Sequence, residues 1–83
     1  MAHRLFEYRV AMMQLGKVTF VDGQWAGKLP PTDPKAIDGC EELSAWLRQA
    51  GLEGWELVSA TAESVGGQIV HQLYLKRELA PRG

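Results

Sequence analysis

The sequence predicts an α+β fold, a small antiparallel sheet of three main strands with one helix packed on one face. Three observations predict it. Apolar residues alternate near the N-terminus, one amphipathic segment follows a proline-rich loop, and two apolar strands joined by a glycine pair close the chain. The resulting order is βαββ-like. We expect a single domain over residues 1–83, with residues 80–83 as a frayed tail.

The first strand is expected from Arg4 to Leu15, where apolar residues recur at every second position. We expect the more apolar set of alternate residues to face the core. The other set, which carries Glu7 and Arg9, would face water or a partner. The expected core-facing residues are Phe6, Tyr8, Val10 and Met12.

Residues 16–36 are interpreted as an insertion made of a hairpin and a proline loop. The Asp22-Gly23 pair is typical of a type I′ turn, in which both central residues have positive φ. The flanking Val18–Phe20 and Gln24–Trp25 form either a small hairpin or an arm that extends the first strand. Three prolines between Gly27 and Lys35 then exclude a helix or a central strand, because proline lacks the backbone donor that both need.

The helix is predicted from a capping box and an apolar stripe. Asp38 is the expected N-cap residue, with Glu41 three positions later. Gly51 is expected at the left-handed position after the helix, where Leu52 would fold back onto Leu47. The stripe comprises Cys40, Leu43, Trp46, Leu47 and Ala50.

Two strands are expected after the helix, Trp55–Thr61 and Gln68–Leu79, joined by a turn at Gly66-Gly67. Trp55 would be the first core residue of the penultimate strand, and Gly54 would relieve the close approach of helix and strand. The last strand is the longest and most apolar, so we place it between the other two, with every pairing antiparallel. Its core-facing residues would be Ile69, Leu73 and Leu75.

Self-association is expected from the size of the chain. One helix covers only one face of such a sheet. A chain of 83 residues also has a small core, and its single cysteine, Cys40, excludes an internal disulfide. Pairing of open faces or of edge strands between chains would solve both problems, so we expect a dimer or higher homo-oligomer. The expected open face carries Glu7, Arg9, Ala11, Val58, Val70 and Tyr74.

Composition argues against several classes of partner. The formal net charge of −1 disfavours binding to nucleic acid polymers, which requires clustered basic residues. No apolar run is long enough for a membrane span, and the N-terminus lacks a signal-peptide pattern. A single thiol favours a cytoplasmic location. Cys40, His3 and His71 are too scattered for a metal site, and no cofactor is expected.

The sequence offers no catalytic constellation. Ser59 and Ser64 lack the glycine-flanked turn of a hydrolase nucleophile. Cys40 is interpreted as a small core hydrophobe, with a reactive thiol in the first helical turn as the alternative. His71 alternates with apolar residues and is interpreted as structural. We therefore expect a protein that is not an enzyme.

Trp25 is the main candidate for binding, because it follows a turn and lies outside both amphipathic patterns. With Lys28 it would stack on a planar ligand or anchor a protein partner. The alternative is that Trp25 closes one end of the core or packs in a dimer. A ligand pocket at a subunit junction would combine Trp25, Lys28 and Arg9, and Tyr74 is a further candidate on the open face.

Four segments together suggest a family resemblance: Phe6–Val10, Leu47–Gly51, Gly54–Ser59 and Leu73–Arg77. They include the string Gly-x-x-Gly-Trp-Glu-Leu-Val that begins at Gly51. On these residues the chain resembles the small bacterial and phage domain-of-unknown-function family 4177. The resemblance implies a βαββ-type fold and no particular activity. Residues 16–36 look longer than the connector usual in that family.

The leading expectation is a non-enzymatic, self-associating domain that binds a protein partner or assembles into a larger complex. The alternative is a small-ligand binder with a pocket at a subunit junction, which in a bacterial or phage protein would sequester a nucleotide signal.

Overall fold

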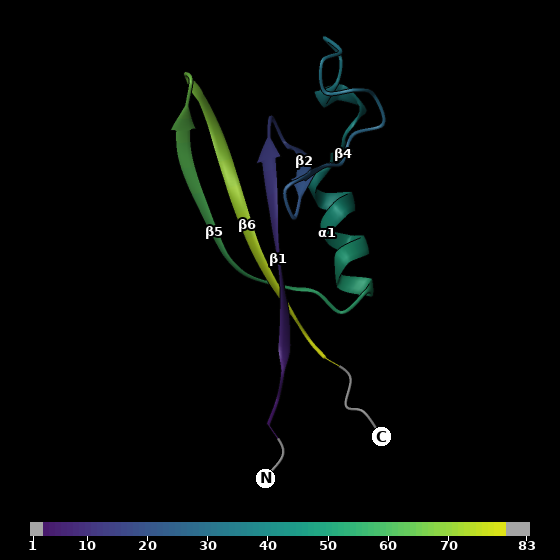
Figure 1. Cartoon of the computed structure of the whole chain (residues 1–83), viewed down its shortest axis with the longest axis vertical. Coiled ribbons are helices and arrows are strands. Elements are labelled where there is room, and N and C mark those ends of the chain that lie inside the picture. The colour runs from purple at the N-terminus through teal and green to yellow at the C-terminus, as the bar shows by residue number, and fades with distance from the viewer. Residues whose placement is uncertain (1–2, 80–83) are drawn as a thin grey trace.

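The computed structural model describes residues 3–79 as an antiparallel sheet with one α-helix on one face (Figure 1). The α+β class is confirmed, but the sheet has six strands rather than three main ones. The strands are β1 (Phe6–Gln14), β2 (Lys17–Val21), β3 (Gln24–Trp25), β4 (Glu41–Glu42), β5 (Glu56–Val65) and β6 (Gln68–Glu78). The helices are the 3-10 turn η1 (Ile37–Gly39) and α1 (Leu43–Leu52). The frayed tail expected at residues 80–83 lies outside the described residues.

The strand order is β3-β2-β1-β6-β5, and β4 pairs with β2 beside this path. The predicted central position of the last strand is confirmed, because β6 pairs with β1 on one side and with β5 on the other. Every pairing is antiparallel, as expected. β2 and β3 extend the sheet beyond β1, so the arm expected from the sequence is part of the sheet.

Three two-residue turns close the hairpins of the sheet. Both residues of each turn have positive φ, at 53° and 76° in Leu15-Gly16, 52° and 79° in Asp22-Gly23, and 57° and 82° in Gly66-Gly67. These are the angles of a type I′ turn, whose twist matches that of the flanking strands. The Asp22 carboxylate also accepts a hydrogen bond from the Val10 N–H at 3.1 Å, which ties the second turn to β1.

The core lies between α1 and the sheet, and it reverses the predicted facing of β1. Ala11 is fully buried, whereas Tyr8 and Val10 are 69% and 39% exposed on the other face. The small Ala11 side chain lets the helix approach the sheet closely, which the bulkier alternate set would prevent. The predicted facing of β6 is confirmed for Leu73 and Leu75, which are both buried. It is wrong for Ile69, which is 64% exposed, and Val70, expected on the open face, is buried. The core cluster comprises Ala11, Val18, Ala50, Trp55, Leu73 and Leu75.

The predicted start of the helix is wrong. Asp38 lies in η1 rather than at an N-cap, and Glu41 belongs to β4. The helix begins at Leu43, and its N-cap residue Glu42 makes no side-chain capping bond. Sheet formation outweighs the local capping signal at Asp38. β4 pairs with β2, and the Leu43 N–H donates to Gly16 O at 3.0 Å.

The predicted end of the helix is also wrong. Gly51 lies inside α1, and the left-handed residue is Gly54, with φ of 91°. Leu52 is 79% exposed, which contradicts its expected role as a hydrophobic latch. The chain turns instead through Trp55, whose N–H donates to Ala50 O at 2.9 Å and whose side chain is buried.

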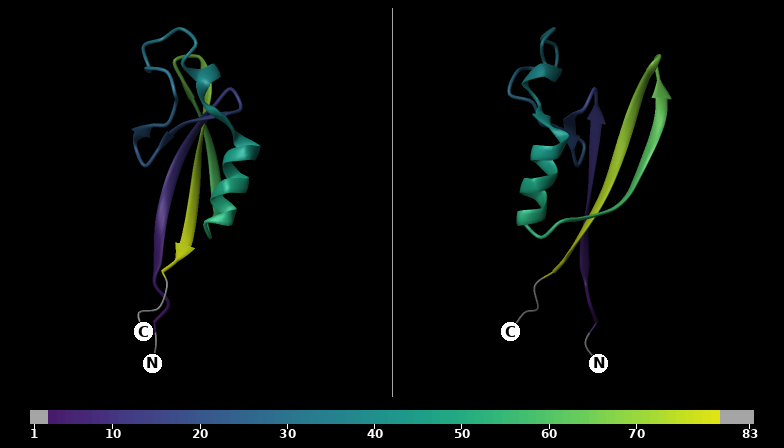
Figure 2. Two further views of the ribbon diagram at one scale, coloured as in Figure 1. Left: turned by 90° about the vertical axis from the view of Figure 1, so that its right-hand side faces the viewer. Right: turned by 180° about the vertical axis from the view of Figure 1, so that it is seen from behind.

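The molecule is elongated, with principal extents of 52 × 25 × 19 Å. The β5–β6 hairpin curves away from α1 and ends far from it, as the right-hand view in Figure 2 shows. All residues of β5 are exposed. The helix therefore covers the central strands β1 and β6 and leaves β5 bare.

Two glycine substitutions distinguish the observed helix end from the predicted one. Gly54→Ala should destabilise the fold by about 1 kcal/mol or more, because φ is positive and a Cβ would lie 3.2 Å from Arg77 Cδ. Gly51→Ala should instead be neutral or stabilising by up to about 1 kcal/mol, because alanine favours a helix and a Cβ there meets nothing within 4 Å. Urea denaturation measures both. A larger loss of stability from Gly51→Ala than from Gly54→Ala would contradict the observed end of the helix.

Candidate functional site

Trp55 contacts two arginines on the helix side of the sheet. The guanidinium carbons of Arg9 and Arg77 are 4.7 and 4.4 Å from ring centroids of the indole. A cation over an aromatic face is attracted by the ring quadrupole, and more strongly where water is excluded. The Trp55 indole N–H is buried and has no hydrogen-bond partner among the described residues. Stacking and burial, rather than hydrogen bonding, therefore hold this ring.

Arg77 joins three parts of the chain. Its Nε donates to Glu7 Oε1 at 2.7 Å, and its Nη2 contacts the same carboxylate oxygen. Its Nη1 donates to the Glu53 carbonyl at 3.0 Å, at the C-terminal end of α1. One side chain thus connects β1, β6 and the turn that follows the helix, which makes this cluster a structural one.

Arg9, a candidate for ligand binding, takes part in the same cluster. Besides its contact with Trp55, its Nε donates to Asp22 Oδ2 at 3.0 Å, in the turn between β2 and β3. Tyr74 lies on the opposite face of the sheet, because it is the register partner of Val10, whereas Arg9 is the partner of Leu75. The structure therefore separates these two candidate residues by the thickness of the sheet.

Trp25 anchors the proline loop to the sheet. Its ring meets Phe20 edge to face with centroids 5.4 Å apart, and its Nε1 donates to Leu29 O at 2.7 Å. Gly27 packs against the ring so closely that a Cβ would lie 2.5 Å from Trp25 Cζ2. These contacts account for a half-buried tryptophan in the insertion.

The structure does not bring the predicted pocket together. Trp25 lines a shallow hollow of about 380 Å³ with residues of the proline loop and η1, and its lining includes neither Arg9 nor Lys28. Lys28 is exposed on the loop.

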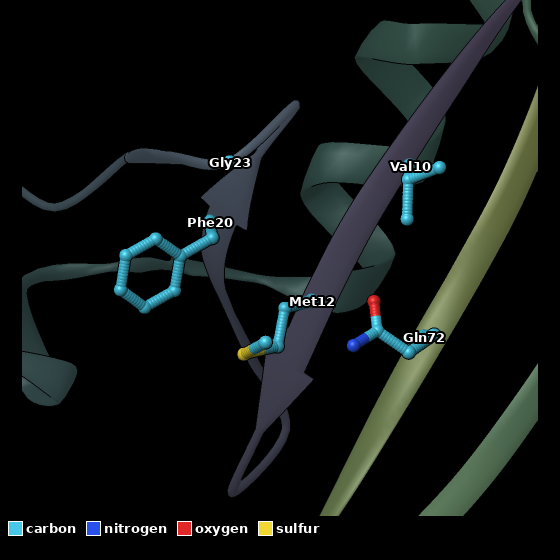
Figure 3. A pocket seen from close by; sticks show the side chains of 5 residues that line it. All are labelled: Val10, Met12, Phe20, Gly23 and Gln72. Atoms are coloured by element: carbon cyan, nitrogen blue, oxygen red, sulfur yellow. The ribbon is translucent and has the colours of Figure 1, made fainter.

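A second hollow lies on the open face of the sheet, where the sequence predicted core. It has a volume of about 380 Å³ and is largely apolar. In Figure 3 the Gln72 amide extends from β6 towards β1, which carries Val10 and Met12. The alternating pattern of β1 did not predict this site, because Val10 and Met12 were expected inside. The small Ala11 between them was the signal for the opposite facing. The lining comprises Val10, Met12, Phe20, Gly23 and Gln72.

Cys40 is buried, as expected for a small core hydrophobe, although it lies between η1 and β4 rather than on the helix. Its Sγ donates to Ala36 O at 3.5 Å. Burial raises the pKa of this thiol, and the positive charge of Lys17 offsets only part of the increase. The reactive thiolate is therefore disfavoured at neutral pH. His71 is half-buried on β6.

Among residues 3–79, no group of three or more histidine, cysteine, aspartate or glutamate side chains is arranged to hold a metal ion. No helix in the described chain has the length and apolar character needed to cross a membrane.

Comparisons with protein-family models, with curated proteins and with solved structures each gave no match. The resemblance to family 4177 therefore stays a prediction from the residues.

The Trp55 cluster predicts a difference between arginine and lysine at position 77. Arg77→Lys should destabilise the fold by about 1 kcal/mol, because an ammonium group cannot contact the Glu7 carboxylate and the Glu53 carbonyl together while stacking on Trp55. The matched control is Arg48→Lys on the exposed face of α1, which should change stability by less than about 0.5 kcal/mol. Equal stabilities of the two variants in urea would contradict the proposed role of Arg77.

Proposed function

We propose that this protein is a non-enzymatic, self-associating interaction domain whose first partner is a second copy of itself. The observation that supports it is the excess of exposed surface. The chain exposes 6174 Å², whereas a compact monomer of its mass, 9.2 kDa, exposes about 5,000 Å². A typical interface buries about 800 Å² on each partner, so an excess of about 1,200 Å² is large enough to contain one.

The shape of the chain supports the same proposal. Its radius of gyration is 14.7 Å, compared with about 12 Å for a compact domain of this length. The exposed surface includes large apolar side chains on the β5–β6 hairpin, with Val58, Val65 and Ile69 at 47%, 53% and 64% exposed. Because Val65 pairs with Gln68 and Ile69 pairs with Ser64, these apolar side chains lie on both faces of the hairpin.

The size of the core also favours association. Within the described residues, the buried apolar side chains lie mainly on one face of the sheet, against a helix of ten residues. A core this small leaves little stability in reserve. Association would stabilise each chain, because a partner that binds only the folded state shifts the folding equilibrium towards it. We propose the cytoplasm as the compartment, since the one cysteine is buried as a free thiol.

The proposal predicts a concentration-dependent homo-oligomer. Size-exclusion chromatography with light scattering should give at least twice the chain mass of 9.2 kDa at micromolar concentration. The unfolding midpoint should also rise with protein concentration, because unfolding is then coupled to dissociation. A chain that stays monomeric at every concentration, with a constant midpoint, would overturn the proposal.

A second candidate function is the binding of a small ligand in the hollow on the open face. The hollow lies beside β1, β2 and β6, its lining is mostly apolar, and its polar side chain is the Gln72 amide. An apolar site with one hydrogen-bonding group suits an uncharged organic molecule. A nucleotide would need a cation at the site, and neither Arg9 nor Lys28 belongs to this lining.

An uncharged fluorescent dye such as Nile red tests the hollow. Its emission should increase on binding to the wild-type protein. Val10→Glu should abolish the increase by placing a carboxylate in the lining, whereas Tyr8→Glu, on the same face but outside the lining, should retain it. Equal responses of the two variants would show that the dye does not bind there.

A further inference from the structure

We propose that β5 pairs antiparallel with β5 of a second copy across a two-fold axis, so that two sheets become one. This inference rests on the proposed self-association and identifies the strand that carries it.

The two edges of the sheet differ in what they offer to a partner. The β3 edge is two residues long and leads into the proline loop. The β5 edge is ten residues long, exposed throughout, and contains neither proline nor lysine. Natural sheets protect long edges with these residues or with covering elements, because an open edge pairs readily with another strand. The β5 edge carries two glutamates and an irregularity between Leu57 and Ser59. The segment 59–65 beyond that irregularity has a single charge and is exposed throughout, so it is the favoured site for a second strand.

Two-fold symmetry restricts how β5 can meet its copy. An axis that makes the two strands antiparallel runs perpendicular to the sheet, so each face continues across the junction. Paired residues must then point to the same face, as in any antiparallel ladder. Both helices therefore lie on the same side of the joined sheet.

The irregularities of β5 select one register. The ladder with β6 is interrupted between Leu57 and Ser59, and the strand ends at Val65 before the turn. The regular segment is therefore 59–65, and the register centred on Ala62 pairs every one of its residues. Ser59 then lies opposite the partner's Val65, Ala60 opposite the partner's Ser64, Thr61 opposite the partner's Glu63, and Ala62 opposite itself.

The charges of the segment suit this register. Glu63 is its charged residue, and the register sets its carboxylate beside a threonine hydroxyl instead of opposite another carboxylate. Glu56 lies beyond the interruption and outside the paired segment. Like charges directly opposite each other, which would destabilise the pairing, are therefore avoided.

Cysteine cross-linking tests the register directly. In a Cys40→Ala background, Ala62→Cys should form a disulfide-linked dimer rapidly under mild oxidation, because the two cysteines face each other across the axis. Ser64→Cys lies on the same face of the same strand, yet its two copies would be about 13 Å apart along the ladder. It should cross-link far more slowly, as should Gln24→Cys on the β3 edge.

A charge at the axis provides the second test. Ala62→Lys should raise the dimer dissociation constant by about tenfold or more, because it sets two ammonium groups opposite each other. Gln24→Lys, on the other edge, should leave the constant unchanged. Since position 62 is exposed in the single chain, the variant should keep the wild-type circular dichroism spectrum.

The possible outcomes separate this inference from the proposed function. Selective cross-linking at position 62 together with weakening by Ala62→Lys supports β5 pairing. If Ala62→Lys does not weaken the dimer, or if the cysteine variants at positions 62, 64 and 24 cross-link equally, β5 pairing is overturned. The chain then self-associates through another surface. A wild-type chain that is always monomeric overturns both.

Discussion

The packing of Trp55 against Arg9 and Arg77 is the contact on which the arrangement of helix and sheet depends. It joins the turn after α1 to β1 and β6, the two strands at the centre of the sheet. Arg77 strengthens the junction by binding the Glu7 carboxylate and the carbonyl at the end of the helix. The helix is thereby held against the central strands, and β5 is exposed along its whole length.

This junction explains which surfaces remain exposed. The face opposite the helix carries large side chains from β1 and β6, including Tyr8 and Tyr74, and a shallow apolar hollow. The β5–β6 hairpin extends beyond the helix and exposes its outer strand (Figure 1). A second copy paired along β5 would cover the edge while leaving the hollow on the open face accessible. Self-association and ligand binding would thus use different surfaces of the same chain.

The parts of the fold that followed from the sequence are those set by neighbouring residues. The Asp22-Gly23 and Gly66-Gly67 turns were recognised because positive φ favours glycine and aspartate at those positions. The central place of β6 followed from its length and apolar character. Trp55 was expected in the core, and burial confirms it. The candidate binding residues were not brought together, since sequence spacing does not reveal that Arg9 and Tyr74 face opposite sides of the sheet.

The sequence alone therefore determined the α+β class, the central place of β6 and the Asp22-Gly23 and Gly66-Gly67 turns, because these depend on local periodicity and backbone preference. Only the tertiary structure decided where the helix begins, since pairing of β4 with β2 outweighs a capping signal at Asp38. It also decided which face of β1 is buried. Both alternate sets of residues in that strand are partly apolar. The buried set is the one that contains Ala11, whose small side chain lets the helix approach the sheet.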